Sequence, residues 1–230
     1  MRTYFKIDTV FKRAEDGTHK LTREWCNPLV DYLKNNEWEF TEKIDGTNTP
    51  VHWDGHNITY GGRTEDAVVP EKVREALDEI FDEAEIQVIE QMFGEKEVTF
   101  YGEMYGGDIS KKHKGVAYAC KKESYILFDI QVGDVWLSRE NVLDIGKKLG
   151  IDVVPTYMTG TLSYGVNVIE RGVAEELHSL RGNRMIEGFV ARPMVRVFDW
   201  KGRPVCVKIR VDDFHGKKYI EQSQHLYNEK

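Results

Sequence analysis

The sequence predicts an α+β fold with largely antiparallel sheets, and three observations support this prediction. Short stretches typical of strands dominate the 230-residue chain, and several are joined by turn sequences that favour hairpins. Stretches with helical spacing interrupt the strands irregularly, which is unlike the regular alternation of a parallel α/β fold. There is neither an internal repeat nor a linker-like segment, so one domain spanning 1–230 is the simplest interpretation.

The predicted strands are spread along the chain. Trp38 and Phe40 alternate with polar residues, as in a half-buried strand, and the Asp-Gly pair that follows is a strong hairpin signal. The segments 51–53 and 58–60, which flank DGHN, form a second hairpin pattern. Further strands are expected at 97–106, 124–130, 134–137, 187–192 and 205–210.

Helices are predicted in three regions. In 70–93 apolar residues recur mostly at helical spacing, which fits one broken helix or two, stopped at Gly94. Ser138 is expected to cap a helix that ends at Gly150. The region 163–180 has a weaker helical pattern.

Composition excludes several classes of protein. Charged residues make up 31% of the chain and aromatic residues 11%, which argues against a disordered chain. No apolar run approaches the ~18 residues of a transmembrane helix, and the first residues lack a signal peptide's apolar stretch. Cys26, Cys120 and Cys206 are odd in number and far apart, which argues against a disulfide framework and a zinc site. We therefore expect a cytoplasmic protein without a membrane partner.

Charge is unevenly distributed along the chain. The formal net charge of −7 argues against a nonspecific nucleic-acid binder. The segment 70–97 is strongly acidic, whereas 110–115, 121–122 and 215–218 are basic. These basic clusters are either solvated loops or a small surface that follows phosphates, and the sequence leaves both interpretations open.

Lys43, in the stretch TEKIDGTNTP (41–50), is the most informative single residue. A lysine beside a turn is usually just solvated, and Lys-x-Asp-Gly should occur in about one chain in twenty of this length. A lysine amine can also be a nucleophile once its charged form is disfavoured. The tetrapeptide alone does not distinguish the two readings.

Five further stretches contain residue types that bind nucleotides. Arg63 ends the second predicted hairpin, Glu103 lies in a glycine-containing strand, and Phe128 precedes Asp129 in an apolar strand. The last two predicted strands contribute three charged residues: Glu187, Lys208 and Arg210. Each alone has an ordinary explanation, since charged strand residues usually face solvent and a phenylalanine is usually core. Their order along the chain makes them informative.

That order resembles the motif series of the covalent nucleotidyltransferases, which include DNA ligases, RNA ligases and mRNA capping enzymes. EKIDGTN (42–48), with Asn48 where DNA ligases and capping enzymes usually have Arg, is similar to the phage-type RNA ligase 2 family. The resemblance covers Lys6 to Lys218. It implies a single adenylation domain of antiparallel sheets flanked by helices. The residues after Lys208 are too few for an OB-fold, so no appended C-terminal domain is expected.

The resemblance also implies a role for each residue. Lys43 would take the adenylate, Glu42 and the backbone beside Ile44 would read the adenine, and Phe128 would stack on it. Three side chains would contact the ribose and the phosphates: Asn48, Arg63 and Glu103. Lys208 and Arg210, where many relatives have two lysines, would hold the α-phosphate; arginine keeps the charge with altered geometry. Glu187 would lie near Mg²⁺, with Mn²⁺ as the alternative ion.

The implied activity is ATP-dependent joining of RNA 5′-phosphate and 3′-hydroxyl ends through a lysine-AMP intermediate, in RNA nick or break repair. The implied partners are RNA with such ends, including a nicked duplex, and an end-healing or RNA-binding protein. The implied location is the cytoplasm or, for a phage-encoded enzyme, the cytoplasm of the host cell. The side chains expected to hold RNA are Arg63, Lys111, Lys112, Lys114, Lys217 and Lys218. Two alternatives stay open: a minimal DNA ligase, and a self-adenylating end-binding module that depends on a partner.

Overall fold

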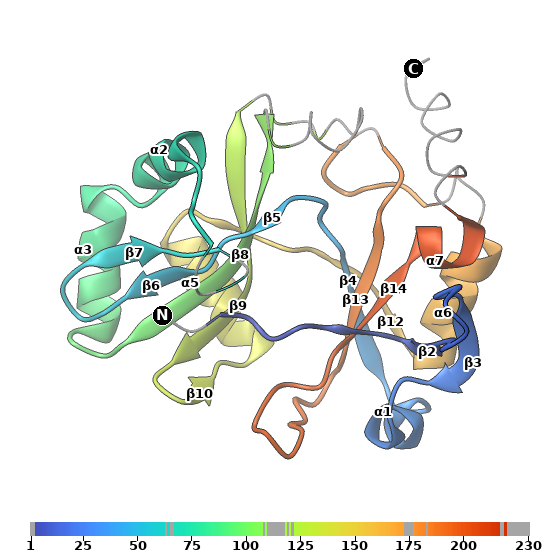
Figure 1. The fold of residues 1–230 in the computed structure, drawn as a ribbon. Helices are drawn as coiled ribbons and strands as arrows, with labels where there is room; N and C mark the ends of the chain where they lie inside the picture. The colour runs from blue at the N-terminus through green and yellow to red at the C-terminus, as the bar shows by residue number, and fades with distance from the viewer. Residues whose placement is uncertain are drawn as a thin grey trace. The chain divides into compact units, whose positions relative to one another are not determined.

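The computed structural model describes residues 3–62, 64, 67–107, 109, 118, 120, 122–172, 177–182, 184–216 and 219. The predicted α+β class is confirmed, with strands that pair mainly antiparallel (Figure 1). The chain forms two compact units: Met1–Tyr4 with Asp45–Val154 (unit 1), and Phe5–Ile44 with Pro155–Lys230 (unit 2). The single domain of 1–230 stays a prediction.

Unit 1 is built on a seven-stranded sheet with the order β10–β9–β8–β6–β7, in which β5 also pairs with β8 and β11 with β9. Its strands are β5 (Thr47–Asn48), β6 (Val51–Trp53), β7 (Ile58–Tyr60), β8 (Val98–Gly106), β9 (Glu123–Val132), β10 (Val135–Trp136) and β11 (Asp152–Val153). The predicted hairpin at 51–60 is confirmed, since Val51 pairs with Tyr60 and Trp53 with Ile58.

Helices of unit 1 begin and end close to the residues predicted from their capping signals. The predicted 70–93 helix is two helices, α2 (Glu71–Ile80) and α3 (Glu83–Phe93), and Gly94 ends the second. Ser138 caps α5 (Arg139–Lys148), because its Oγ accepts the Asn141 N–H at 3.3 Å. Apolar residues of these helices share one buried core with the sheet: Leu77, Ile89, Val142, Ile145, Phe100 and Leu127.

Unit 2 is built on a five-stranded sheet with the order β1–β14–β13–β4–β12. Its strands are β1 (Asp8–Thr9), β4 (Trp38–Glu42), β12 (Thr156–Gly160), β13 (Gly188–Pro193) and β14 (Val207–Arg210), and a separate pair is formed by β2 (Phe11–Arg13) and β3 (Leu21–Trp25). The helices are α1 (Pro28–Leu33), α6 (Leu162–Arg171) and α7 (Val211–His215). A second core joins the sheet to α6 through Phe40, Phe189, Ile209, Leu162, Val166 and Ile169.

Two local predictions for unit 2 were wrong. β4 is buried along its whole length rather than on one face, since Glu39 and Thr41, which alternate with Trp38 and Phe40, are buried too. Its polar side chains are buried with partners; the Thr41 hydroxyl, for example, donates to the Val190 carbonyl at 3.1 Å. The helix expected at 163–180 ends at Arg171, and His178 instead bridges to Met185 as extended chain. None of the helices in the described part of the chain combines the length and apolarity that crossing a bilayer requires.

Candidate active site

Lys43 directly follows β4 and is ion-paired and partly buried. Its N–H donates to the carbonyl of Gly188, the first residue of β13, at 2.9 Å. Its Nζ lies 2.7 Å from Oε2 of Glu187, and 25% of its side chain is exposed. This is not the environment of an ordinary solvated lysine, because the backbone and the amine are both fixed by one neighbouring segment of chain.

Glu187 links Lys43 to a second cation. Its other oxygen, Oε1, lies 3.4 Å from Nε of Arg210, whose guanidinium also pairs with Asp212. The Glu187 side chain is 16% exposed, so the charges interact in partly desolvated surroundings, where they attract each other more strongly than in water. The structure therefore brings Lys43, Glu187 and Arg210 together, as the motif order predicted.

Lys208 lies on the same face of β14 as Arg210. Along this strand Val207 and Ile209 are fully buried, while Lys208 and Arg210, which alternate with them, are partly exposed. Gly188 pairs with Arg210 and has a φ of 149°. A Cβ at Gly188 would lie 2.0 Å from the Ile209 carbonyl oxygen, so only glycine allows β13 to begin this close to β14. The glycine of the Glu-Gly motif thus holds Glu187 beside the cations.

Glu42, predicted to contact the adenine, is buried and hydrogen-bonded within unit 2. Its carboxylate is 2% exposed and accepts hydrogen bonds from the Ser179 hydroxyl at 2.5 Å and the Leu180 N–H at 2.8 Å. Each carboxylate oxygen therefore has one partner inside the protein, which fixes the orientation of the side chain. Sequence reasoning missed Ser179 and Leu180, because the apolar spacing of 163–180 predicts a helix there.

Burial raises the pKa of the Glu42 carboxyl, although the bonds from Ser179 and Leu180 and the charges of Arg184 and Arg181 oppose the rise. The folded state therefore binds this proton more readily than the unfolded state. The contribution of Glu42 to stability is largest at low pH. It falls as the pH rises from the ordinary glutamate value of ~4.3 through the raised folded-state pKa.

Replacing Glu42 by glutamine should remove this pH dependence, since the amide oxygen can still accept from Leu180 but cannot ionise. As the pH rises from the ordinary glutamate pKa through the raised pKa of Glu42, the free energy of unfolding of Glu42→Gln should increase relative to that of the wild type. Urea unfolding at successive pH values measures the difference, with Glu37→Gln, at an exposed position of the same unit, as the control. A constant difference between Glu42→Gln and the wild type would contradict the assignment.

The Asp45-Gly46 pair is not the hairpin turn that the sequence suggested. The strand before it, β4, pairs with β12 and β13, whereas the strand after it, β5, pairs with β8 of the other sheet. Gly46 does not have a positive φ. A Cβ there would lie 2.2 Å from the Met104 carbonyl oxygen, so glycine is needed because the backbones of two segments approach closely.

Asn48 and Glu103, both predicted to contact the nucleotide's sugar or phosphates, face each other in unit 1. They are directly opposite partners in the β5–β8 pair. Directly opposite side chains on an antiparallel pair lie on the same face, with Cβ atoms about 5 Å apart. The two side chains can therefore contact the same small group.

Phe128 lies at an irregularity of β9. Tyr101 pairs with Asp129 and Gly102 with Leu127, so Phe128 is the extra residue of a β-bulge. The ring is partly exposed and meets the Tyr4 ring edge to face, with centroids 5.0 Å apart. A bulge changes the direction of a side chain relative to regular alternation, so Phe128 is not simply a core residue.

Several predicted contacts lie outside the described residues: Arg63, Lys111, Lys112, Lys114, Lys217 and Lys218. For a divalent ion, the described residues contain no group of three or more His, Cys, Asp or Glu side chains that could hold one. Mg²⁺, however, is often held by one or two carboxylates together with substrate phosphates and water. The single carboxylate of Glu187 beside the amine fits an ion that arrives with a nucleotide.

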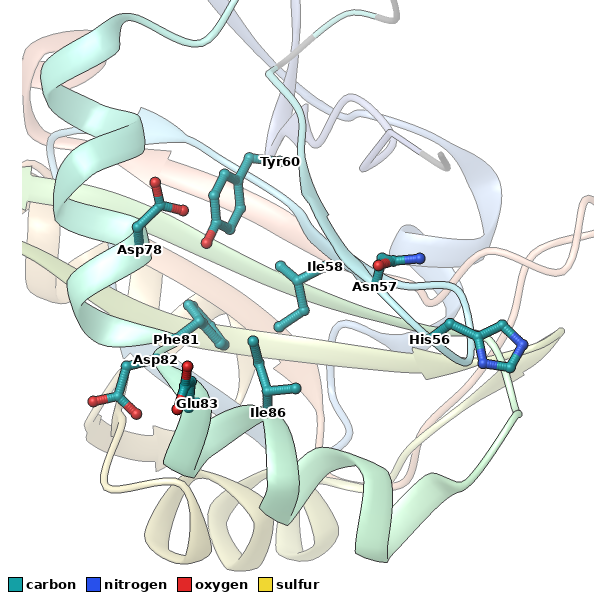
Figure 2. Close-up of a pocket in the computed structure, with 9 residues that line it drawn as sticks. All are labelled: His56, Asn57, Ile58, Tyr60, Asp78, Phe81, Asp82, Glu83 and Ile86. Atoms are coloured by element: carbon teal, nitrogen blue, oxygen red, sulfur yellow. The ribbon is translucent and has the colours of Figure 1, made fainter.

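Unit 1 also has a cavity of about 410 Å³ between the β6–β7 turn and the junction of α2 with α3 (Figure 2). Phe81 and Ile86 line it with apolar surface, and three carboxylates stand around it: Asp78, Asp82 and Glu83. None of the predicted site residues lines this cavity. Its negative charge disfavours the phosphates of a nucleotide, so we do not assign it to the active site.

Comparison with known proteins gives a family match and several structural matches. A family model described as RNA ligase matches residues 36–210, a range that includes Lys43, Glu187 and Arg210. The structure of the Naegleria gruberi RNA ligase with PPi is similar, with a TM-score of 0.66 and 18% identity over 96% of this chain and 58% of that one. The structure of a mutant of that ligase with ATP and Mn has a TM-score of 0.63 and 18% identity, over 96% of this chain and 59% of that one.

An archaeal ATP-dependent RNA ligase is also similar, with a TM-score of 0.60 and 16% identity over 94% of this chain and 50% of that one. At these identities the solved structures share the fold. The chain spans less than two thirds of the length of each of these three structures. No match was found among curated protein sequences.

Proposed function

Because the chain belongs to the RNA ligase family, we propose that it uses ATP to join RNA 5′-phosphate and 3′-hydroxyl ends through a covalent Lys43-AMP intermediate. The observation that carries the proposal is the ion-paired cluster of Lys43, Glu187 and Arg210, with Lys208 on the same strand face as Arg210. A primary amine beside a carboxylate and further cations suits attack on a phosphate better than it suits a purely structural role.

In the first step the Lys43 Nζ attacks the α-phosphorus of ATP. A nitrogen–phosphorus bond forms, the bond to the bridging oxygen breaks, and pyrophosphate leaves. The attacking amine must be neutral, and the ion pair with Glu187 stabilises its charged form, so this pair has to open or accept the proton. Glu187 Oε2, at 2.7 Å, is close enough to take that proton directly.

The cations beside the amine stabilise charge on the phosphate oxygens. Phosphoryl transfer depends mainly on positioning and on such electrostatic stabilisation. Lys208 and Arg210 would hold the α-phosphate, and Glu187 would hold Mg²⁺ or Mn²⁺. When bound, the ion would neutralise charge that develops on the phosphate oxygens.

Three further predicted residues would bind the nucleoside. Phe128, partly exposed at its bulge, would stack on the adenine, and Asn48 and Glu103 would hold the ribose from the same face of the β5–β8 pair. Base–aromatic stacking contributes about 1–3 kcal/mol per base. The AMP would then pass to an RNA 5′-phosphate, and a 3′-hydroxyl would displace it to form the phosphodiester, as repair of RNA nicks or breaks requires.

Incubation with radiolabelled ATP and, separately, GTP, followed by a panel of nicked RNA and DNA duplexes, tests the proposal. We expect label on the protein from ATP, a covalent adduct that transfers to RNA, and sealing of nicked RNA. Sealing of DNA alone would identify a DNA ligase. A stable adduct without sealing of any duplex would identify a self-adenylating module that depends on an end-healing partner. No adduct from either nucleotide would refute the proposal.

A further inference from the structure

The segment 194–206, which joins β13 to β14, concentrates apolar surface (the orange excursion between these strands in Figure 1). We call it the β13–β14 hairpin. Ten large hydrophobic residues in the described part of the chain are exposed, and four of them lie here: Met194, Val195, Phe198 and Trp200. Trp200 is 88% exposed, which leaves most of an indole in contact with water. An apolar cluster of this kind marks an interaction surface.

The tip of the hairpin is ordered by its own hydrogen bonds. Val205 N–H donates to the Val197 carbonyl at 2.8 Å, and Gly202 turns the chain with a φ of 70°. Asp199 Oδ1 accepts the N–H groups of Lys201 and Arg203, at 2.9 Å each, and Oδ2 accepts Nε–H of Arg203 at 2.8 Å. Trp200 is thus held at the tip of a tight turn, so little ordering is needed when a ligand meets it.

Charge at the hairpin is opposite to that of the whole chain. Between 194 and 206 there are three basic residues and one acidic residue, Asp199, whereas the chain carries −7. The Asp199 carboxylate is hydrogen-bonded to Arg203 within the turn. Lys201, exposed beside the indole, has its Nζ 4.8 Å from the Trp200 ring centroid. The surface therefore combines a flat aromatic ring with a cation that can reach a phosphate near it.

We infer that the β13–β14 hairpin binds the RNA substrate, with an unpaired base stacked on Trp200 and a neighbouring phosphate on Lys201. An aromatic platform beside a cation is the arrangement that binds single-stranded nucleic acid without reading its sequence. The excess of positive charge favours a polyanion over an apolar protein surface as the occupant. This inference rests on the proposed function, because it supplies an RNA-binding surface for that reaction.

Binding of a fluorescently labelled, 5′-phosphorylated single-stranded RNA, followed by anisotropy without ATP, tests the inference. Trp200→Ala should weaken binding roughly tenfold, and Trp200→Phe should restore most of it because a ring remains. Lys201→Ala should lower the slope of log affinity against log salt by about 0.7. Tyr32→Ala, at a position of α1 that is 82% exposed, is the matched control and should bind like the wild type.

AMP-lysine formation by Trp200→Ala is the second readout, and it should equal that of the wild type. Binding by Trp200→Ala within about twofold of the wild type would overturn the inference. So would unchanged RNA binding accompanied by loss of self-association or of a protein partner, which would make the hairpin a protein interface. Trp200-dependent RNA binding by a protein that forms no AMP-lysine would refute the proposed function and still support the inference.

Discussion

Replacing Lys43 by alanine is expected to abolish the covalent AMP adduct completely. The Nζ is the atom that forms the bond to phosphorus, and no other lysine of the described chain pairs with Glu187. The fold should persist, because Glu187 keeps its second cation, Arg210, when the Lys43 amine is removed. Intact-protein mass spectrometry after incubation with ATP and a divalent ion measures the adduct, and thermal unfolding measures stability.

Two further variants make this result specific. Lys43→Arg keeps a positive charge opposite Glu187 but presents a guanidinium, which is not a nucleophile at neutral pH. It should therefore lose the adduct while retaining wild-type stability. Lys34→Ala, which removes another ion-paired lysine of the same unit, should retain the adduct. An AMP mass shift on Lys43→Ala would show that Lys43 is not the nucleophile.

Replacing Glu187 by glutamine is expected to lower the rate of AMP-lysine formation by at least about 100-fold. Glutamine has nearly the same size but neither balances the charges of Lys43 and Arg210 nor holds a divalent ion. If the substitution weakens binding of the divalent ion, high concentrations of Mn²⁺ should restore part of the lost rate. Single-turnover formation of the adduct over a series of metal concentrations measures both effects.

A matched control exists in the same unit. Glu170→Gln removes a carboxylate that pairs with Arg23 and lies on α6, and it should leave the rate unchanged. The opposite result for Glu187→Gln is also informative. If Glu187 only restrained the Lys43 amine in its charged form, its removal would raise the rate, and that outcome would contradict the role proposed for Glu187.

The sequence by itself determined the local features of this protein. Ser138 begins α5 and Gly94 ends α3, as predicted, and the turn between 53 and 58 closes the predicted hairpin. Such signals depend on residues within one turn of chain, so they survive without knowledge of the rest of the fold. The order of the motif residues likewise identified Lys43 as the residue to examine, and the family match includes it.

Only the tertiary structure decided what these residues touch. Lys43 and Glu187 are 144 positions apart and meet because β4 and β13 are paired in one particular register. Glycine is required at position 46 because the strand that contains Met104 approaches closely. The bulge at Phe128 results from a register shift between β8 and β9. The buried carboxylate of Glu42 depends on Ser179, far along the chain. Contacts of this kind depend on register, packing and desolvation, which are properties of the folded sheets and not of any short stretch of sequence.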